Sequence, residues 1–223
     1  MSKKRKKKNG RKERIIGNNS KYIGTYTITE EPLEDKYTKR IPKEIRKRAE
    51  ELHDMLLHKP KKIIPLLLGY IKKYPNVPLL YNYLSAAYGR IGDLEKVEST
   101  VVENLNKHPD YFFAKLNYAD ICLRKGKASK VPYIFNHKLD LKLLYPKRST
   151  FHISEFAGFA GTICKYYNAI GERKMAESLY ENLRVIAPNE LATKEAKEDL
   201  YPSILQRLFR RIVTINSHER NLT

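Results

Sequence analysis

The residues with the clearest potential for metal chemistry lie near position 50. Glu50 and His53 have the i, i+3 spacing that puts a carboxylate and an imidazole on one helix face, as in di-iron helical bundles. Such centres need a second copy of the pair together with further glutamates, and no second Glu-x-x-His pair is found in the sequence. His53 and His58 are five residues apart, which is not the i, i+4 spacing of two zinc ligands on a helix. We interpret the segment as a solvated helix face, and we predict no metal site and no cofactor.

Residues for nucleophilic catalysis are also scarce. The two cysteines, Cys122 and Cys164, lie within apolar patterns typical of helices. They support neither a disulfide framework nor a cysteine zinc site, and a reducing cytosol is the simpler interpretation. The sequence contains no nucleophile elbow and no phosphate-binding glycine loop. The sequence therefore predicts no catalytic residue, and we expect a protein that is not an enzyme.

Positive charge is the most unusual property of the chain. It has 44 Lys and Arg against 25 Asp and Glu, a formal net charge of +19 that favours polyanions and acidic surfaces as partners. Most of the excess lies in the first third of the chain, and nine cations near the start form a candidate polyanion-binding arm: Lys3, Lys4, Arg5, Lys6, Lys7, Lys8, Arg11, Lys12 and Arg14.

This arm has three interpretations that the sequence leaves open. It is a solvated tail, a phosphate-binding arm for RNA or DNA, or, in a eukaryote, a nuclear import signal. No RNA-binding module with stacking aromatic residues is recognisable, which argues against base-specific binding. Neither a secretory apolar segment nor a transmembrane run is expected, because the longest apolar stretch, residues 63–71, contains Pro65 and Gly69 and falls short of the roughly 20 residues needed. We expect a cytoplasmic protein, or a nuclear one if the source is eukaryotic.

The helical pattern begins near Lys43. Residues 1–42 are predicted to be a basic, disordered tail followed by an extended arm. Residues 22–29 alternate β-branched and aromatic side chains, but no second strand lies nearby in sequence. We expect this arm to lie along the helical body or to stay loose.

An internal period organises the rest of the chain. Gly92 and Gly126 are 34 residues apart, and so are Pro75 and Pro109. Gly171 precedes Pro188 by 17 residues, just as Gly92 precedes Pro109. Glycine suits a helix-to-helix turn and proline ends a helix, so the shared register predicts stacked helical hairpins.

These residues resemble the tetratricopeptide repeat, a 34-residue helix-turn-helix unit. In the unit that starts at Pro78, the family positions are occupied by Tyr81, Leu84, Ser85, Tyr88, Gly92 and Pro109. The unit that starts at Ala157 matches at Ile163, Cys164, Tyr167, Gly171, Ala176, Tyr180 and Pro188, and the unit that starts at Phe112 matches in its first helix. The resemblance implies an all-α, right-handed helical-repeat solenoid of antiparallel helix pairs over residues 43–189.

The chain departs from this pattern in two places. Gly126 and Gly171 are 45 residues apart, so about eleven extra residues fall between Pro132 and Ser154, as a longer second helix or as a loop around residues 145–149. The unit at residues 44–75 lacks the turn glycine, and we interpret it as a degenerate first repeat.

The C-terminal region, residues 190–223, is predicted to be a capping helix and a tail. Residues 189–199 are charged and helical in pattern, and residues 201–215 carry an apolar stripe that would cover the end of a repeat array. The alternative is an amphipathic helix for a membrane surface or a partner, because Arg207, Arg210 and Arg211 lie on the opposite face.

The resemblance also implies a concave groove. Its candidate protein-binding residues come from the first helix of each unit, and they are Asn82, Arg90, Phe113, Leu116, Asn117, Asp120, Arg124, Lys165 and Asn168. Arg90 and Arg124, flanked by Phe113 and Leu116, indicate a peptide with acidic and apolar groups. The Lys-Asn-Asn-Lys-Arg set with which family members grip a chaperone's C-terminal carboxylate is matched only at Asn117.

Two functions follow from these observations. The first is a non-catalytic scaffold that binds a protein or peptide in its groove, with the basic arm adding electrostatic attachment. The alternative is a protein associated with RNA or a ribonucleoprotein, which binds phosphates through the basic N-terminal third. The sequence does not indicate the partner's identity or the oligomeric state.

Overall fold

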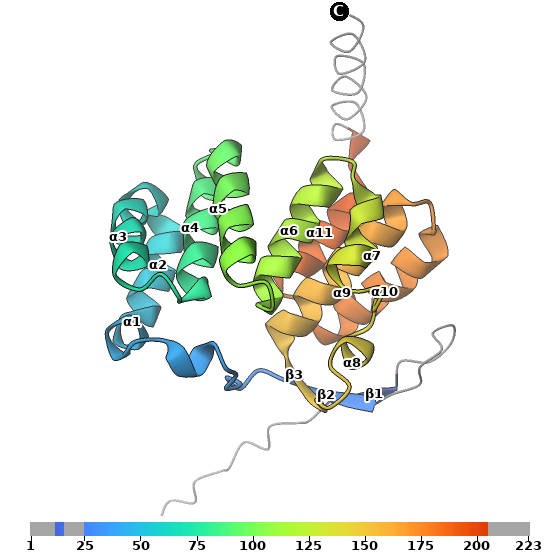
Figure 1. Cartoon of the computed structure of the whole chain (residues 1–223). Coiled ribbons are helices and arrows are strands. Elements are labelled where there is room, and N and C mark those ends of the chain that lie inside the picture. The colour runs from blue at the N-terminus through green and yellow to red at the C-terminus, as the bar shows by residue number, and fades with distance from the viewer. Residues whose placement is uncertain (1–11, 16–24, 205–223) are drawn as a thin grey trace, which may run out of the picture. The chain divides into compact units, whose positions relative to one another are not determined.

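The computed structural model describes residues 12–15 and 25–204, and this part of the chain is mostly helical, as predicted (Figure 1). Its α-helices are α1 (Lys43–Lys47), α2 (Ala49–His58), α3 (Pro60–Lys73), α4 (Pro78–Arg90), α5 (Leu94–Lys107), α6 (Phe112–Arg124), α7 (Val131–Ile134), α8 (Leu141–Leu144), α9 (Ile153–Ala169), α10 (Arg173–Ile186) and α11 (Leu191–Leu200). Two 3₁₀ turns, η1 (Thr38–Arg40) and η2 (Ala128–Lys130), and three short strands, β1 (Lys12–Ile15), β2 (Thr25–Thr29) and β3 (Thr150–His152), complete the described elements.

The chain divides into two compact units at the junction of β3 and α9. One unit spans Glu13–His152, and the other contains the described residues 12 and 153–204. In the first unit, α3 packs against α2 and α4, and α4 packs against α5. The apolar face of each helix supplies the core between them, as seen at Leu52, Leu67 and Leu80, which are fully buried. Burial of such side chains is the main force that holds neighbouring helices together.

The three glycines of the predicted period adopt the backbone conformation that their turns require. Gly92, Gly126 and Gly171 have φ values of 78°, 68° and 84°, in the left-handed region that favours glycine. In each turn, the amide after the glycine donates to a carbonyl five residues back, as Asp93 does to Tyr88 at 3.0 Å. This bond closes a Schellman motif, which ends α4, α6 and α9 in the same way.

The predicted proline stops also share one geometry. Tyr74, His108 and Ala187 each precede a proline of the period, with φ between −133° and −131° and ψ between 54° and 64°. A residue before proline is disfavoured in the α region, so the helix ends there. The same stop ends α2, α8 and α11, at Lys59, Tyr145 and Tyr201, each followed by proline.

The extra residues between the second and third glycines fold as several short elements. The structure has η2, α7, α8 and β3 here, so the extra length is neither a longer second helix nor a plain loop. Asn136 and His137 have φ values of 52° and 58°, which end α7 after four residues because a helix cannot continue through the left-handed region.

The N-terminal arm forms sheet pairing that the sequence analysis did not predict. β2 pairs in parallel with β3, with Ile28 opposite Phe151, and β1 lies on the other side of β2 (Figure 1). The partner strand was missed because β3 is only three residues long and lies more than 120 residues away. The fold is therefore mostly helical with a small sheet, and residues 12–15 of the basic segment form a strand instead of remaining irregular.

The second unit consists of α9, α10 and α11, which pack against one another. The predicted helix after Pro188 is confirmed as α11. The predicted capping segment, residues 201–215, lies almost entirely outside the described residues. Within the described part of the chain, no helix is long and apolar enough to cross a membrane.

Candidate functional site

The predicted groove residues of the first unit lie on facing parts of α4 and α6. On α4, Asn82 is half-buried, and Ala86 and Arg90 follow it as exposed residues at i+4 and i+8. On α6, Phe113, Asn117, Asp120 and Arg124 recur with the spacing of one helix face. The Asn117 amide donates to Asn82 Oδ1 at 3.2 Å, so the two faces meet. We call the surface formed by Asn82, Ala86, Arg90, Phe113, Asn117, Asp120 and Arg124 the α4–α6 face.

An amide network fixes the central part of this face. Asn82 Oδ1 also accepts a bond of 2.9 Å from Asn104 Nδ2 on α5, and the same nitrogen lies 3.2 Å from the Pro78 carbonyl. Asn104 is 1% exposed, so this network is inside the fold. A buried amide is costly unless it is hydrogen-bonded, so the network also determines how α4, α5 and α6 approach one another.

The apolar residues of the predicted groove differ in exposure. Phe113 is half-buried, and its ring meets those of Phe112 and Tyr111 at centroid distances of 5.6 Å and 5.9 Å. Leu116 is 5% exposed and belongs to the core, so it offers little surface to a ligand. Of the two, only Phe113 can contribute to a binding surface.

The charged residues of the face are also unequal. Asp120 forms an ion pair with Arg124, with 3.0 Å between the carboxylate and the guanidinium nitrogen. Arg90 is exposed and makes no ion pair with any residue that the structure describes. Arg90 is therefore the cation of this face best placed to meet an external anion.

The N-terminal arm lies against the end of the same helices. The Tyr37 ring contacts Tyr111 edge-on at 4.9 Å, and Lys36 lies 3.4 Å from the Asp110 carboxylate. Tyr37 also meets His108 at 6.3 Å. Residues 36 and 37 therefore lie against the helical body, one of the two alternatives expected for the arm, whereas residues 25–29 pair with β3. The contribution of Tyr37 was missed because nothing near it in sequence marks the contact.

His108 is a buried histidine beneath this contact. Burial lowers the pKa of His108 below its ordinary value, and neighbouring Lys107 acts in the same direction. A hydrogen bond with the Pro75 backbone opposes them. Burial therefore disfavours the charged form of the imidazole, which packs against the Tyr81 ring at 5.8 Å.

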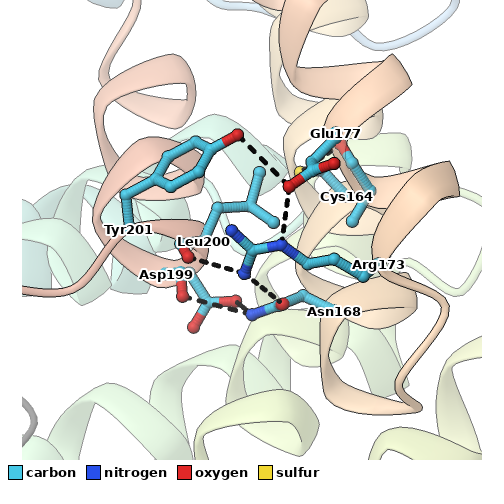
Figure 2. A network of polar contacts seen from close by, with 8 residues as sticks. Cys164, Asn168, Arg173, Glu177, Asp199, Leu200 and Tyr201 are labelled. Carbon is cyan, nitrogen blue, oxygen red and sulfur yellow. Dashed lines mark hydrogen bonds and ion pairs between the residues drawn. The ribbon is translucent and has the colours of Figure 1, made fainter.

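In the second unit, α11 binds the two predicted groove residues. Lys165 lies 3.1 Å from the Glu195 carboxylate, and its side chain is 15% exposed. Asn168 donates to the Asp199 carboxylate at 2.8 Å and accepts from Arg173 (Figure 2). These side chains hold α11 in place, so they are occupied within the chain.

Arg173 is the centre of the network in Figure 2. Its guanidinium donates to the Leu200 carbonyl at 2.7 Å and to the Glu177 carboxylate at 2.8 Å. The Tyr201 ring lies under the same guanidinium at 4.8 Å. Arg173 therefore caps the C-terminal end of α11, where the helix dipole favours a cation.

A glycine allows the close packing between α9 and α11. A Cβ atom added to Gly161 would lie 3.1 Å from both the Cβ and the carbonyl oxygen of Ala192. This contact is tighter than ordinary side chains accept, so any larger residue would push the helices apart.

The residues considered for catalysis or metal binding lie on α2, α6 and α9. Glu50 and His53 are exposed on α2, and His58 pairs with Asp54 at 3.6 Å. Burial raises the pKa of the Cys164 thiol to about 12, and its sulfur donates to the Ala176 carbonyl. Within the described ranges, no cluster of three or more His, Cys, Asp or Glu residues could hold a metal ion.

The predicted polyanion-binding arm can be located only in part. Lys3, Lys4, Arg5, Lys6, Lys7, Lys8 and Arg11 lie outside the described residues. Lys12 and Arg14 belong to β1, where the structure describes the backbone alone.

Comparison of the chain with protein-family models, with curated proteins and with solved structures found no match.

Proposed function

We propose that this protein is a non-catalytic binding scaffold of the helical-repeat type, similar in plan to tetratricopeptide repeats. On this proposal, antiparallel helix pairs stack as a right-handed solenoid, and the α4–α6 face receives a protein or peptide. The observation that carries it is the recurrence of one turn and one stop: three glycines with positive φ and three prolines after matching helix ends. Recurrent geometry in helical hairpins is typical of repeat proteins, which use extended surfaces for binding.

The chemistry of the α4–α6 face indicates the kind of ligand. Arg90 offers an exposed cation without a carboxylate partner among the described residues. Phe113 offers half-exposed aromatic surface, whereas the Asn117 amide nitrogen is bonded to Asn82. A peptide with an acidic side chain and an apolar side chain would meet both groups. The basic N-terminal arm would add electrostatic attraction to an acidic partner.

Site-specific photocrosslinking tests this proposal. A photoreactive phenylalanine analogue replaces Ala86, an exposed residue of the α4–α6 face, and in the matched control it replaces Glu95, an exposed residue of α5. Irradiation is carried out in native extract at high salt and after nuclease treatment. High salt weakens partners held mainly by the basic arm, and nuclease removes partners bridged by nucleic acid. We expect one discrete adduct from position 86 that is absent at position 95.

A second variant links the adduct to the chemistry of the face. Arg90→Glu in the Ala86-labelled protein should reduce the adduct at least about tenfold, because a charge-assisted hydrogen bond to a carboxylate contributes roughly 1.5–3 kcal/mol. Equal adducts from positions 86 and 95, or an adduct that persists in the Arg90→Glu protein, would count against a binding role for this face.

A further inference from the structure

The outer surface of α3 has an unusual charge distribution. The helix carries Lys61, Lys62, Lys72 and Lys73 and no acidic residue. Its inner face is buried through Ile63, Leu67 and Tyr70. The opposite stripe, Lys61, Pro65, Leu68 and Lys72, is exposed along its whole length. This stripe is basic at both ends and uncharged in the middle.

Most of these cations lack an internal partner. Lys73 pairs with Glu44 at 2.7 Å, but Lys61, Lys62 and Lys72 are exposed and form no ion pair with a residue that the structure describes. The same holds for Lys43 and Lys47 on α1, which lies beside the end of α3 because Glu44 contacts both Lys73 and Tyr74. The positive charge of this surface is therefore available to an external partner.

The lysines at the start of α3 lie where the helix dipole is unfavourable for positive charge. Lys59, Lys61 and Lys62 surround the N-terminus of the helix, where the dipole favours anions, and the first turn has neither an acidic residue nor a side-chain cap. Stability alone would favour Asp or Glu at these positions. Residues that depart from the preference for acidic side chains at a helix N-terminus are commonly retained because they bind a ligand.

We propose that the outer surface of α3, together with α1, is a docking surface for the phosphate backbone of double-stranded RNA. Lys61 and Lys72 are eleven residues apart, which at 1.5 Å per residue separates the two basic ends by about 16 Å. Two cationic ends with a neutral middle suit two rows of phosphates on either side of a groove. Proteins bind RNA duplexes largely through such backbone contacts and through shape.

The residues between the basic ends exclude other modes of nucleic-acid binding. The exposed stripe has no aromatic ring on which an unpaired base could stack, because Tyr70 is buried. It also has no Arg, Asn or Gln to read base edges in a groove. The stripe therefore offers no group that reads base sequence, and Arg46 of α1 donates to the carbonyls of Thr38, Lys39 and Ile41. The proposed surface shares no residue with the α4–α6 face on which the proposed scaffold function rests.

Fluorescence anisotropy of the full chain tests the proposal. The probe is a fluorescein-labelled RNA duplex of about 20 base pairs, titrated at several potassium chloride concentrations. In the test variant, Lys61→Gln, Lys62→Gln and Lys72→Gln are combined. In the matched control, Lys174→Gln, Lys194→Gln and Lys197→Gln remove the same charge from three exposed lysines of the second unit.

We expect the test variant to weaken binding about tenfold or more at low salt. The slope of log K against log salt concentration should become shallower by about two to three, because each lost phosphate contact reduces the magnitude of that slope by roughly 0.7–0.9. The control should stay within about twofold of the unmodified protein. Circular dichroism melts verify that both variants fold, and single Lys61→Gln and Lys72→Gln variants should each lower the slope by about one.

Three outcomes would overturn the proposal. Equal losses in the two triple variants would assign binding to overall charge, and no loss in either would assign it to other cations of the chain. Stronger binding to a DNA duplex, to single-stranded RNA or to phosphatidylserine vesicles in competition would assign the surface to a different polyanion.

Discussion

At the scale of single residues, a few backbone positions determine where the helices end. Gly92, Gly126 and Gly171 hold positive φ, whereas Gly69 lies within α3, where an added Cβ would meet nothing within 4 Å. Identical residues therefore have opposite structural roles. The first group is needed for its backbone conformation, and Gly69 is replaceable.

Substitution of these glycines should have effects of opposite sign. Gly171→Ala should lower the free energy of unfolding by about 1–2 kcal/mol, because a left-handed conformation is strained for alanine. Gly69→Ala should raise it by about 0.5–1 kcal/mol, because alanine is the better helix residue. Urea unfolding followed by circular dichroism measures both. The same sign for the two variants would show that the turn conformation is not what Gly171 supplies.

Protonation of His108 should couple stability to pH. Burial lowers its pKa from the ordinary 6.5, so below that value the unfolded chain binds more protons than the folded chain. Stability is then fully present above about pH 6.5 and is lost as the pH falls through the lowered folded value. Thermal melts between about pH 7.5 and pH 5.5 should show a steeper loss for the unmodified protein than for His108→Gln.

A control separates His108 from the other titrating groups. The matched variant is His53→Gln, at an exposed position of α2, measured over the same pH range. A His108→Gln protein with the same pH profile as the unmodified protein would mean that His108 is not responsible.

At the scale of elements, α11 is held by specific contacts on its partner helices. Arg173 caps its C-terminal end, and Lys165 and Asn168 bind Glu195 and Asp199 on its side. Gly161 permits the close approach at Ala192. The second unit therefore depends on one helix whose docking combines polar pairing with close backbone packing.

Enlarging Gly161 should weaken the docking of α11. Gly161→Val should destabilise the fold by about 1–3 kcal/mol, because the added side chain meets both a Cβ and a carbonyl oxygen at 3.1 Å. Gly89→Val is the matched control, since its added Cβ meets only the end of Val97 at 3.8 Å. Hydrogen exchange should show faster exchange at residues 191–200 in the Gly161 variant alone. Unchanged protection of α11 would contradict this packing role.

At the scale of the whole molecule, charge and core occupy different faces of the same helices in the first unit. The core runs from Ile45 of α1 to Ile121 of α6, whereas the cations without internal partners among the described residues gather on the exposed surfaces of α1 and α3. The α4–α6 face carries mainly amides, an aromatic ring and one unpaired guanidinium among the described residues. A salt-dependent partner and a salt-resistant partner would therefore use separate surfaces.

The local features of this fold could be predicted from the sequence. Glycine and proline restrict the backbone at their own positions, so the ends of α4, α6 and α10 follow from Gly92, Gly126 and Pro188 without any tertiary contact. Apolar periodicity likewise identifies the buried faces of helices such as α3 and α5.

Only the tertiary structure determined which distant segments meet. The pairing of β2 with β3, the contact of Tyr37 with Tyr111 and the burial of Leu116 depend on contacts across long sequence separations. The sequence predicted that Lys165 and Asn168 line a binding groove, but in the structure both contact α11. The physical reason is that secondary-structure propensity and apolar periodicity reflect interactions between residues close in sequence. The burial of a given side chain depends instead on which other elements cover it.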